Sequence, residues 1–221
     1  MIFDHVSVSW GRDETFSING DVSNVSIQDS IIAQGLDTHS CGGLIQTDGG
    51  VSIIRTLYID NKTRNPKVKG VNEFVNNVVS TTFARKAGTL KGWAHLIGLQ
   101  LGRRRRFDYP TVATLRSPTD ALDYVLAHAG ASKSRDHVDT YLIDTEVRSW
   151  GKKGAIISDE NASPINGPGP ISGGTAPVDT DKDGIPDAYE SAHGTNPNVA
   201  DSATIASNGY SNLENYINSL V

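Results

Sequence analysis

Residues 50–55 (GVSIIR) decide the fold, because apolar and polar side chains alternate as in a β-strand with one buried face. Residues 5–10 (HVSVSW), 24–29 (NVSIQD) and 73–78 (EFVNNV) have the same character. Along the chain the four segments start 19, 26 and 23 residues apart, and Gly, Asn and Asp bound them. This loose repeat predicts a solenoid of stacked β-coils that share their sheets. An antiparallel sandwich with irregular turns is the alternative that spacing alone leaves open.

Beyond the repeats, we expect two helices within residues 107–160 that pack on the solenoid. Ser117, Pro118 and Asp120 give the first helix a cap, a first-turn proline and an acid, and Gly130 ends it. The second is expected over residues 135–148 with Ser134 as its cap. The expected buried side chains are Leu122, Val125, Leu126 and Ala129 on the first helix, and Val138, Leu142 and Val147 on the second.

The chain of 221 residues therefore divides into four predicted regions. Residues 1–106 form the partial solenoid, in which 80–106 are atypical, and residues 107–160 form its helical tail. Residues 161–178 are rich in Pro and Gly and predict a linker, and residues 179–221 form a small module. The single cysteine cannot form an internal disulfide, and no stretch is long and apolar enough to span a bilayer.

Charge is sorted by position although the total is only −5. Residues 1–54 carry a net charge of −6, residues 55–106 carry +10, residues 107–178 carry −3 and residues 179–221 carry −6. The pattern indicates a basic surface for an anionic partner and acidic sites for cations. The run of four arginines at 103–106 has no interleaved aromatic residues, so we do not expect a nucleic-acid partner.

Residues 179–190 (DTDKDGIPDAYE) have the spacing of a twelve-residue calcium loop. Carboxylates stand at positions 1, 3, 5, 9 and 12, and glycine at position 6 permits the sharp turn. A solvated acidic turn is the alternative. The segment resembles thrombospondin type 3 and dockerin repeats, which implies calcium-rich extracellular surroundings. The expected ligands are Asp179, Asp181, Asp183, the backbone carbonyl of Ile185, Asp187 and Glu190, with Asp201 added from the following turn.

Residues 57–69 (LYIDNKTRNPKVK) concentrate four cations: Lys62, Arg64, Lys67 and Lys69. At the end of a β-coil these side chains would project into one cleft. Such a cleft suits a polymer with a carboxylate on every unit. An exposed basic turn is the alternative reading of the composition.

Several segments together resemble the pectate lyase family. They are residues 3–7 (FDHVS) with Trp10, 13–18 (DETFSI), 43–45 (GLI) and above all 64–69 (RNPKVK), where the family has arginine, any residue, proline, two residues and arginine. The likeness covers residues 1–79, and residues 108–159 resemble the tail of bacterial members. It implies an all-β fold, a right-handed parallel β-helix, here truncated and followed by the two tail helices and the calcium module.

The resemblance also implies an activity and a site. Members cleave 4-linked galacturonan by calcium-dependent β-elimination. Arg64 is implied as the base that removes the C5 proton, and Lys69, in place of the second arginine, as a ligand for a substrate carboxylate. Asp13 and Glu14 match the segment that supplies calcium ligands, although ordinary surface acids remain the alternative. His39 is a candidate substrate contact or a structural residue, and Lys62 and Lys67 are further candidate substrate contacts.

A basic role for Arg64 is chemically demanding, because an ordinary arginine is fully protonated. We expect nearby Lys62, Lys67, Lys69 and bound calcium to favour its neutral form, together with alkaline conditions. The chain also departs from the family pattern. Ser17 stands where many members have a further aspartate, and Cys41 lies near the place of a substrate-binding lysine.

The sequence begins inside the family pattern, and the coils expected between Val79 and Phe107 are replaced by a basic, aperiodic stretch. We therefore expect a fragment or a rearranged gene product that exposes strand edges and aggregates readily. Two other functions stay open: a catalytically defective solenoid that binds acidic polysaccharide, and a structural β-solenoid. For the lyase we expect Ca²⁺ as cofactor, an acidic polysaccharide as partner, no membrane partner, a monomeric state and secretion, although residues 1–5 begin no signal peptide.

Overall fold

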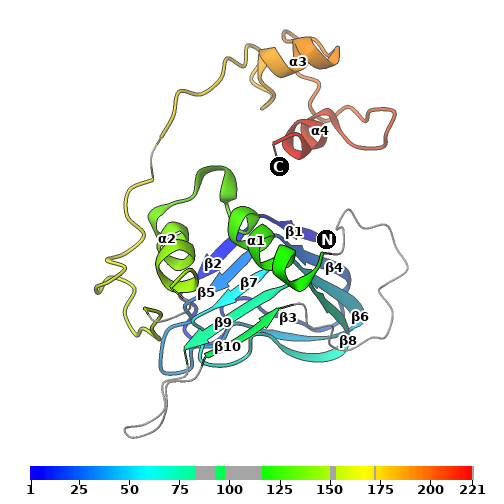
Figure 1. Ribbon diagram of the computed structural model, residues 1–221. Helices are drawn as coiled ribbons and strands as arrows, with labels where there is room; N and C mark the ends of the chain where they lie inside the picture. The colour runs from blue at the N-terminus through cyan, green and yellow to red at the C-terminus, as the bar shows by residue number, and fades with distance from the viewer. Residues whose placement is uncertain (83–92, 98–115, 150–152, 172, 221) are drawn as a thin grey trace, which may run out of the picture. The chain divides into compact units, whose positions relative to one another are not determined.

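The computed structural model describes residues 1–82, 93–97, 116–149, 153–171 and 173–220, and it divides the chain into two compact units, Met1–Pro170 and Ile171–Val221 (Figure 1). The first unit is a parallel β-solenoid flanked by short helices, which confirms the predicted fold class. None of the described helices has the length and apolar character needed to cross a membrane.

One sheet of the solenoid stacks successive coils in parallel. Its strands are β1 (Ile2–Asp4), β3 (Ile18–Asn19), β4 (Ser23–Gln28), β6 (Leu44–Ile54) and β8 (Lys67–Val75). The pairs β1–β4, β3–β6, β4–β6 and β6–β8 are all parallel. A spacing of twenty-odd residues therefore corresponds to one coil, as the repeats predicted.

The second sheet continues each coil after a corner. Its parallel strands are β2 (Ser7–Ser9), β5 (Ile31–Ala33), β7 (Leu57–Ile59) and β9 (Val78–Thr82). The last strand, β10 (Trp93–Ile97), pairs with β9 in the antiparallel direction. Of the predicted strands, residues 24–28 and 50–54 lie within β4 and β6, whereas residues 5–10 contain the short β2 and residues 73–78 run from β8 into β9.

Each of these segments begins, ends or bends at a residue with positive φ at the corner between the sheets. His5, Asp29, Arg55 and Asn76 have φ of 52°, 46°, 52° and 51°. A left-handed residue redirects the chain sharply, and asparagine and aspartate adopt this conformation more readily than most residues. Only Asn76 lies inside a predicted segment, so the pattern of residues 73–78 could not locate that corner.

The interior of the solenoid is filled by inward-facing apolar side chains. Ile27, Ile53 and Phe74 share one register across β4, β6 and β8 and are almost fully buried. The remaining buried members of this cluster are Val25, Ile32, Ile45, Val51, Tyr58 and Val79. Residues equivalent in successive coils thus stack into a continuous core.

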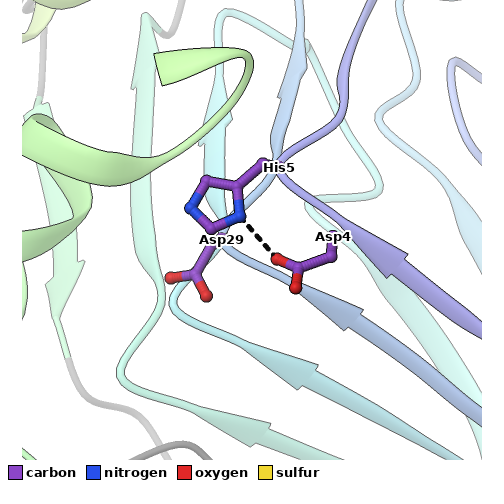
Figure 2. A group of neighbouring side chains, drawn as sticks. All are labelled: Asp4, His5 and Asp29. Carbon is purple, nitrogen blue, oxygen red and sulfur yellow. Dashed lines mark hydrogen bonds and ion pairs between the residues drawn. The ribbon is translucent and has the colours of Figure 1, made fainter. Parts of the chain in front are cut away.

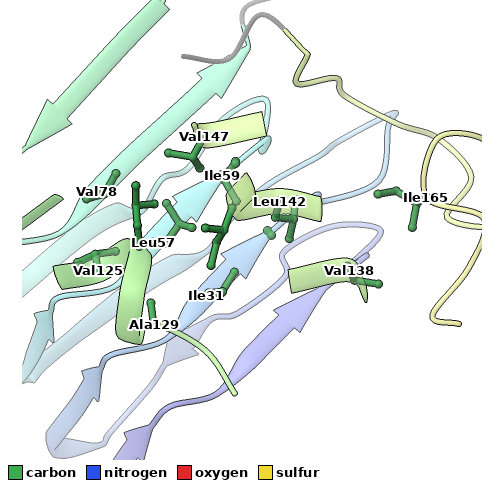
Figure 3. Packing of buried hydrophobic residues seen from close by; sticks show 13 residues of the cluster. Ile31, Leu57, Ile59, Val78, Val125, Ala129, Val138, Leu142, Val147 and Ile165 are labelled. Atoms are coloured by element: carbon green, nitrogen blue, oxygen red, sulfur yellow. The ribbon is translucent and has the colours of Figure 1, made fainter. Parts of the chain in front are cut away.

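Helices cover the outer face of the second sheet, so its central strands β5 and β7 are buried on both faces. Figure 3 shows Ile31, Leu57 and Ile59 on this face packing against Val125 and Leu142. Burial on both faces explains why these strands read as continuous apolar runs (IIA, LYI) without alternation. The cluster also contains Ala33, Val78, Leu126, Ala129, Val138, Ile143, Val147 and Ile165.

The first helix is α1 (Pro118–His128), and its predicted start is confirmed. The Ser117 hydroxyl accepts a hydrogen bond from the Asp120 backbone N–H at 3.2 Å. The second predicted helix begins later than expected. Ser134 lies in a 3₁₀ turn, η1 (Ser132–Ser134), and the Asp136 carboxylate caps the helix by accepting from Asp139 N at 2.9 Å.

That second helix consists of α2 (His137–Thr140) followed by a π-helix, η2 (Tyr141–Val147). The predicted linker begins within the first unit: Ile165 is buried there, and its carbonyl lies 3.1 Å from His137 Nε2. The second unit contains α3 (Asp187–His193) and α4 (Asn212–Asn218). The arginine run at 103–106, like most of the atypical stretch 80–106, lies outside the described residues.

Candidate functional site

Three coils align where the predicted catalytic segments lie. Parallel β-bridges join Glu14 to Cys41 and Cys41 to Thr63. Cys41 N also donates to the Asp13 carbonyl at 3.1 Å. Because the bridges stack these coils in register, residues 13–14 and residues 63–64 are aligned on either side of the coil at Cys41, although they are distant in sequence.

The stacking brings together four of the predicted site residues, which we call the Arg64 cluster: Asp13, Glu14, His39 and Arg64. The Arg64 guanidinium forms an ion pair with the Glu14 carboxylate, and its Nη1 lies 3.7 Å from Asp13 Oδ1. His39 Nδ1 lies 3.2 Å from the same Asp13 oxygen. The Arg64 side chain is 32% exposed and that of Asp13 is 65% exposed, so the cluster is accessible to a ligand.

Two asparagines that the sequence analysis did not identify hold the loop that carries Arg64. The fully buried Asn61 accepts a hydrogen bond from Gly35 N at 2.9 Å and donates to the Ile32 carbonyl at 3.0 Å. Asn61 also donates to Asn65 Oδ1 at 3.0 Å, and Asn65 donates back to the Asn61 carbonyl at 2.9 Å. These bonds fix the backbone of residues 61–65 to the preceding coil.

Replacing Asn61 by alanine is expected to destabilise the first unit. The change leaves Gly35 N and the Ile32 carbonyl without their buried partners, which costs about 2–3 kcal/mol. Urea unfolding followed by circular dichroism measures the cost. The exposed Asn161→Ala change serves as the control, with an expected effect within about 0.5 kcal/mol. Equal stabilities of the two variants would contradict this role of Asn61.

The predicted lysines lie around the cluster in different contacts. Lys62 Nζ forms an ion pair with Asp37 Oδ1 at 2.8 Å. Lys67 and Lys69 are exposed at the start of β8, on either side of Val68, which packs against the solenoid core. Since side chains alternate along a strand, both ammonium groups lie on the outer face of the sheet.

Lys69 also lines a polar hollow of about 350 Å³ on that outer face. Asn19, Gln46 and Lys69 occupy one register on β3, β6 and β8 and share this lining. The other lining residues are Gly20, Asp21, Thr47, Asp48, Gly49 and Gly70. Amides, carboxylates and an ammonium group are suited to hydrogen bonding with saccharide hydroxyl and carboxylate groups.

The donors of the Arg64 cluster fit a hard cation such as calcium. Asp13 and Glu14 provide carboxylate oxygens, which calcium prefers, and the Arg64 guanidinium already occupies these oxygens as a stand-in cation. Ser17, in place of a family aspartate, accepts a hydrogen bond from Leu44 N at 2.9 Å. Two protein carboxylates leave most of the roughly six to eight calcium positions to other oxygens, including those of a substrate.

The calcium loop in the second unit brings its carboxylates together in two groups that share Asp183. One ligand atom each of Asp179, Asp181 and Asp183 lies within 4.8 Å of the others, and the same holds for Asp183, Glu190 and Asp201. Glu190 is completely buried, and neither of its carboxylate oxygens has a hydrogen-bond partner. Burial, followed by the nearby aspartates, raises the pKa of Glu190. An unpartnered buried carboxylate is the arrangement that a bound cation satisfies.

Other loop residues maintain its shape. Gly184 has φ of 97°, as the predicted sharp turn requires. The Asp187 carboxylate accepts hydrogen bonds from Thr180 N at 2.7 Å and Thr180 Oγ1 at 2.6 Å. Asp201 Oδ1 accepts from Asn212 Nδ2 at 2.9 Å, which ties α4 to the loop. Ile185 N donates to Asp183 Oδ1 at 3.0 Å, and its side chain is buried.

Removing calcium is expected to loosen the second unit. A ligand at a hundred times its Kd stabilises the folded state by about 2.7 kcal/mol, and chelation removes this contribution. Hydrogen–deuterium exchange of the full chain measures the change: peptides covering residues 179–218 should exchange faster in chelator, and peptides covering β5 to β7 should not. Unchanged exchange over residues 179–218 would contradict calcium binding by this loop.

A third group, Asp4, His5 and Asp29, lies at a corner of the solenoid (Figure 2). His5 Nδ1 lies 2.6 Å from Asp4 Oδ1, and this hydrogen bond raises the pKa of His5. The Arg55 guanidinium donates to the buried Asp29 carboxylate. Arg55 already supplies positive charge to Asp29, and because the two residues lie on successive coils their ion pair links neighbouring coils.

Fold and site together define a parallel β-helix protein with an exposed arginine–carboxylate cluster on stacked coils. Fungal proteins named "Probable pectate lyase C" match the whole chain: that of Neosartorya fischeri is 50% identical, that of Aspergillus flavus 51% and that of Emericella nidulans 48%. The chain is therefore related to pectate lyases along its whole length, which confirms the resemblance seen in its sequence.

The chain spans about two thirds of these relatives, covering 65% of the Neosartorya fischeri and Aspergillus flavus proteins and 64% of the Emericella nidulans protein. The first alignment extends over 277 residues, so 56 of its positions have no counterpart among the 221 residues of this chain. The bacterial TSP3 repeat profile matches residues 179–200. No solved structure matches the chain.

Proposed function

We propose that this chain cleaves 4-linked galacturonan, the backbone of pectate, by calcium-assisted β-elimination. The observation that carries the proposal is the meeting of Arg64 with Asp13 and Glu14 on stacked coils. A base and a cation-binding carboxylate pair thereby lie within reach of one sugar ring. The names of the curated relatives support the same activity.

The chemistry requires stabilisation of negative charge at one position. The C5 proton lies alpha to a carboxylate and is only weakly acidic while that carboxylate is a free anion. Calcium held by Asp13 and Glu14 would supply positive charge to the substrate carboxylate, where charge develops in the transition state. The exposed cations Lys69, Lys67 and Lys62 would bind further carboxylates along the polymer.

In the proposed step, neutral Arg64 accepts the C5 proton. The electron pair of the C5–H bond forms the C4–C5 double bond, and the C4–O4 bond breaks. The leaving O4 takes the electron pair and then a proton from solvent. His39, which contacts Asp13, would orient that carboxylate or contact the substrate. Alkaline conditions favour the neutral form of the base.

The second unit is proposed as a calcium module of the same enzyme. Its ligands would be Asp179, Asp181, Asp183, the Ile185 carbonyl, Asp187, Glu190 and Asp201. The TSP3 match and the two carboxylate groups support this assignment. We further propose that the protein is secreted and monomeric and acts on acidic polysaccharide without a nucleic-acid or membrane partner.

Ultraviolet absorbance of the C4–C5 unsaturated product tests the proposal on polygalacturonate. We expect absorbance to rise with calcium present and to stop rising in chelator. Binding of polygalacturonate without product would instead favour the defective carbohydrate-binding solenoid. Equal binding of polygalacturonate and heparin without product would favour a structural solenoid with a basic surface.

A further inference from the structure

We propose that Arg64 is the resident cation of the Asp13–Glu14 site and that calcium binding displaces its guanidinium toward the substrate. The movement of the guanidinium toward a substrate rests on the proposed function. The competition for the carboxylates involves only Arg64, Asp13, Glu14 and calcium. The inference makes Arg64 a competitor of the metal as well as the proposed base.

The contacts place the guanidinium on the oxygens that calcium needs. Arg64 Nη1 contacts the Glu14 carboxylate and lies 3.7 Å from Asp13 Oδ1. The Glu14 side chain is only 19% exposed, so the ion pair is partly shielded from water. Charges shielded in this way interact more strongly than fully solvated ones. Calcium and the guanidinium cannot both occupy these oxygens without strong repulsion between the two cations.

The structure permits this exchange without refolding of the loop. The Arg64 carbonyl accepts a hydrogen bond from Gly43 N at 2.7 Å, and the Asn61–Asn65 amide bonds hold the same segment. The backbone is therefore anchored to the preceding coil, whereas the long Arg64 side chain is 32% exposed. Rotation of side-chain torsions alone can carry the guanidinium from the carboxylates to a bound ligand.

The exchange gives calcium two effects at one site. In its absence, Glu14 and Asp13 retain Arg64, and the guanidinium is not available to a sugar ring. With calcium bound, the carboxylates are occupied by the metal, and the added positive charge repels the guanidinium. Linkage requires reciprocity: if calcium weakens the hold on Arg64, Arg64 must weaken calcium binding to the same degree.

Calcium titration calorimetry without substrate tests the inference on the full chain. All variants carry Asp181→Asn and Glu190→Gln, which silence the loop of the second unit. Arg64→Gln should bind calcium about tenfold more tightly than the parent, an increase equivalent to about 1.4 kcal/mol. Lys62→Ala is the matched control, because it removes the same charge two residues away but loses a contact with Asp37 instead.

We expect Lys62→Ala to change calcium affinity less than about twofold, since a solvated charge at a distance is screened by salt. Equal affinities of Arg64→Gln and its parent, or equal gains in Arg64→Gln and Lys62→Ala, would overturn the inference. Weaker calcium binding by Arg64→Gln would also overturn it. Folding of each variant is checked by circular dichroism, and Arg64→Ala provides a second neutral replacement with the same expected gain.

The calorimetric result is separable from the proposed activity. Tighter calcium binding by Arg64→Gln with no product from the wild-type chain would support the exchange and refute the lyase. Product from the wild-type chain with unchanged calcium affinity in Arg64→Gln would support the lyase and refute the exchange.

Discussion

Replacing Arg64 by alanine is expected to reduce the rate of product formation from polygalacturonate about 10³-fold, within the range expected when a proton-transfer group is removed. Arg64→Lys should also be severely impaired, because an ammonium group cannot reproduce the planar fork of a guanidinium. Product absorbance under saturating calcium measures both rates.

The loss must be separated from unfolding. Arg148→Ala serves as the control: Arg148 forms an exposed pair with Asp144 at 3.0 Å in the helical tail, away from the proposed site residues in sequence. We expect this variant to retain activity within about twofold, since exposed pairs contribute little to stability. An active, folded Arg64→Ala protein would show that Arg64 is not the base.

Replacing Glu146 by glutamine is expected to flatten the pH dependence of stability above pH 5. Glu146 is 1% exposed where the helical tail packs on the solenoid. Burial, followed by the neighbouring Asp60, raises its pKa to about 11. The Asp60 side chain faces it from the turn after β7, and Tyr141 lies beside it on η2, with a pKa raised to about 12 by burial.

Proton linkage sets whether folding stability rises or falls with pH. The folded state retains the Glu146 proton up to about pH 11, whereas the unfolded chain loses it near the ordinary value of 4.5. The stabilisation is therefore fully present below pH 4.5 and is lost as the pH rises toward 11. Between pH 5 and pH 9 the wild-type chain should therefore lose stability from this group, on the order of 1 kcal/mol per pH unit.

Glutamine retains the shape of the protonated acid and cannot ionise, so Glu146→Gln should be the more stable protein at pH 9. Urea unfolding at pH 5, 7 and 9 measures the difference. Asp123→Asn, at an exposed position on α1, is the matched control and should leave the pH dependence unchanged. Parallel pH profiles of wild type and Glu146→Gln would show that Glu146 is already ionised in the folded state.

Features formed by residues close together in the sequence could be predicted, and features formed by distant residues could not. The calcium loop draws its main ligands from twelve consecutive residues. Period-two alternation with a coil-length repeat indicated the solenoid but left a sandwich open, and the family resemblance favoured the parallel β-helix. The corner at Asn76 was not predicted, because residues 73–78 read as one strand although Asn76 is left-handed. The carboxyl pair Asp60–Glu146 could not be predicted, since it exists only after the helical tail docks on β7.

For the Arg64 cluster, the sequence indicated the individual residues but not their contacts. Its members were each proposed from a family resemblance, but Asp13 and Arg64 meet only because coil stacking aligns their segments. No sequence pattern marked Asn61 and Asn65 as the amides that hold the loop of Arg64. Buried amides that hydrogen-bond between coils are defined by the register of stacking, which a single sequence does not reveal.

A crystal structure of the full chain with calcium and an oligogalacturonate, in which calcium is located by anomalous scattering, tests the account most directly. We predict an anomalous peak bound by Glu14 and Asp13, with the Arg64 guanidinium turned from these carboxylates toward C5 of the adjoining sugar. An oligosaccharide bound elsewhere, with Arg64 still paired to Glu14 and no peak beside it, would contradict the proposed mechanism.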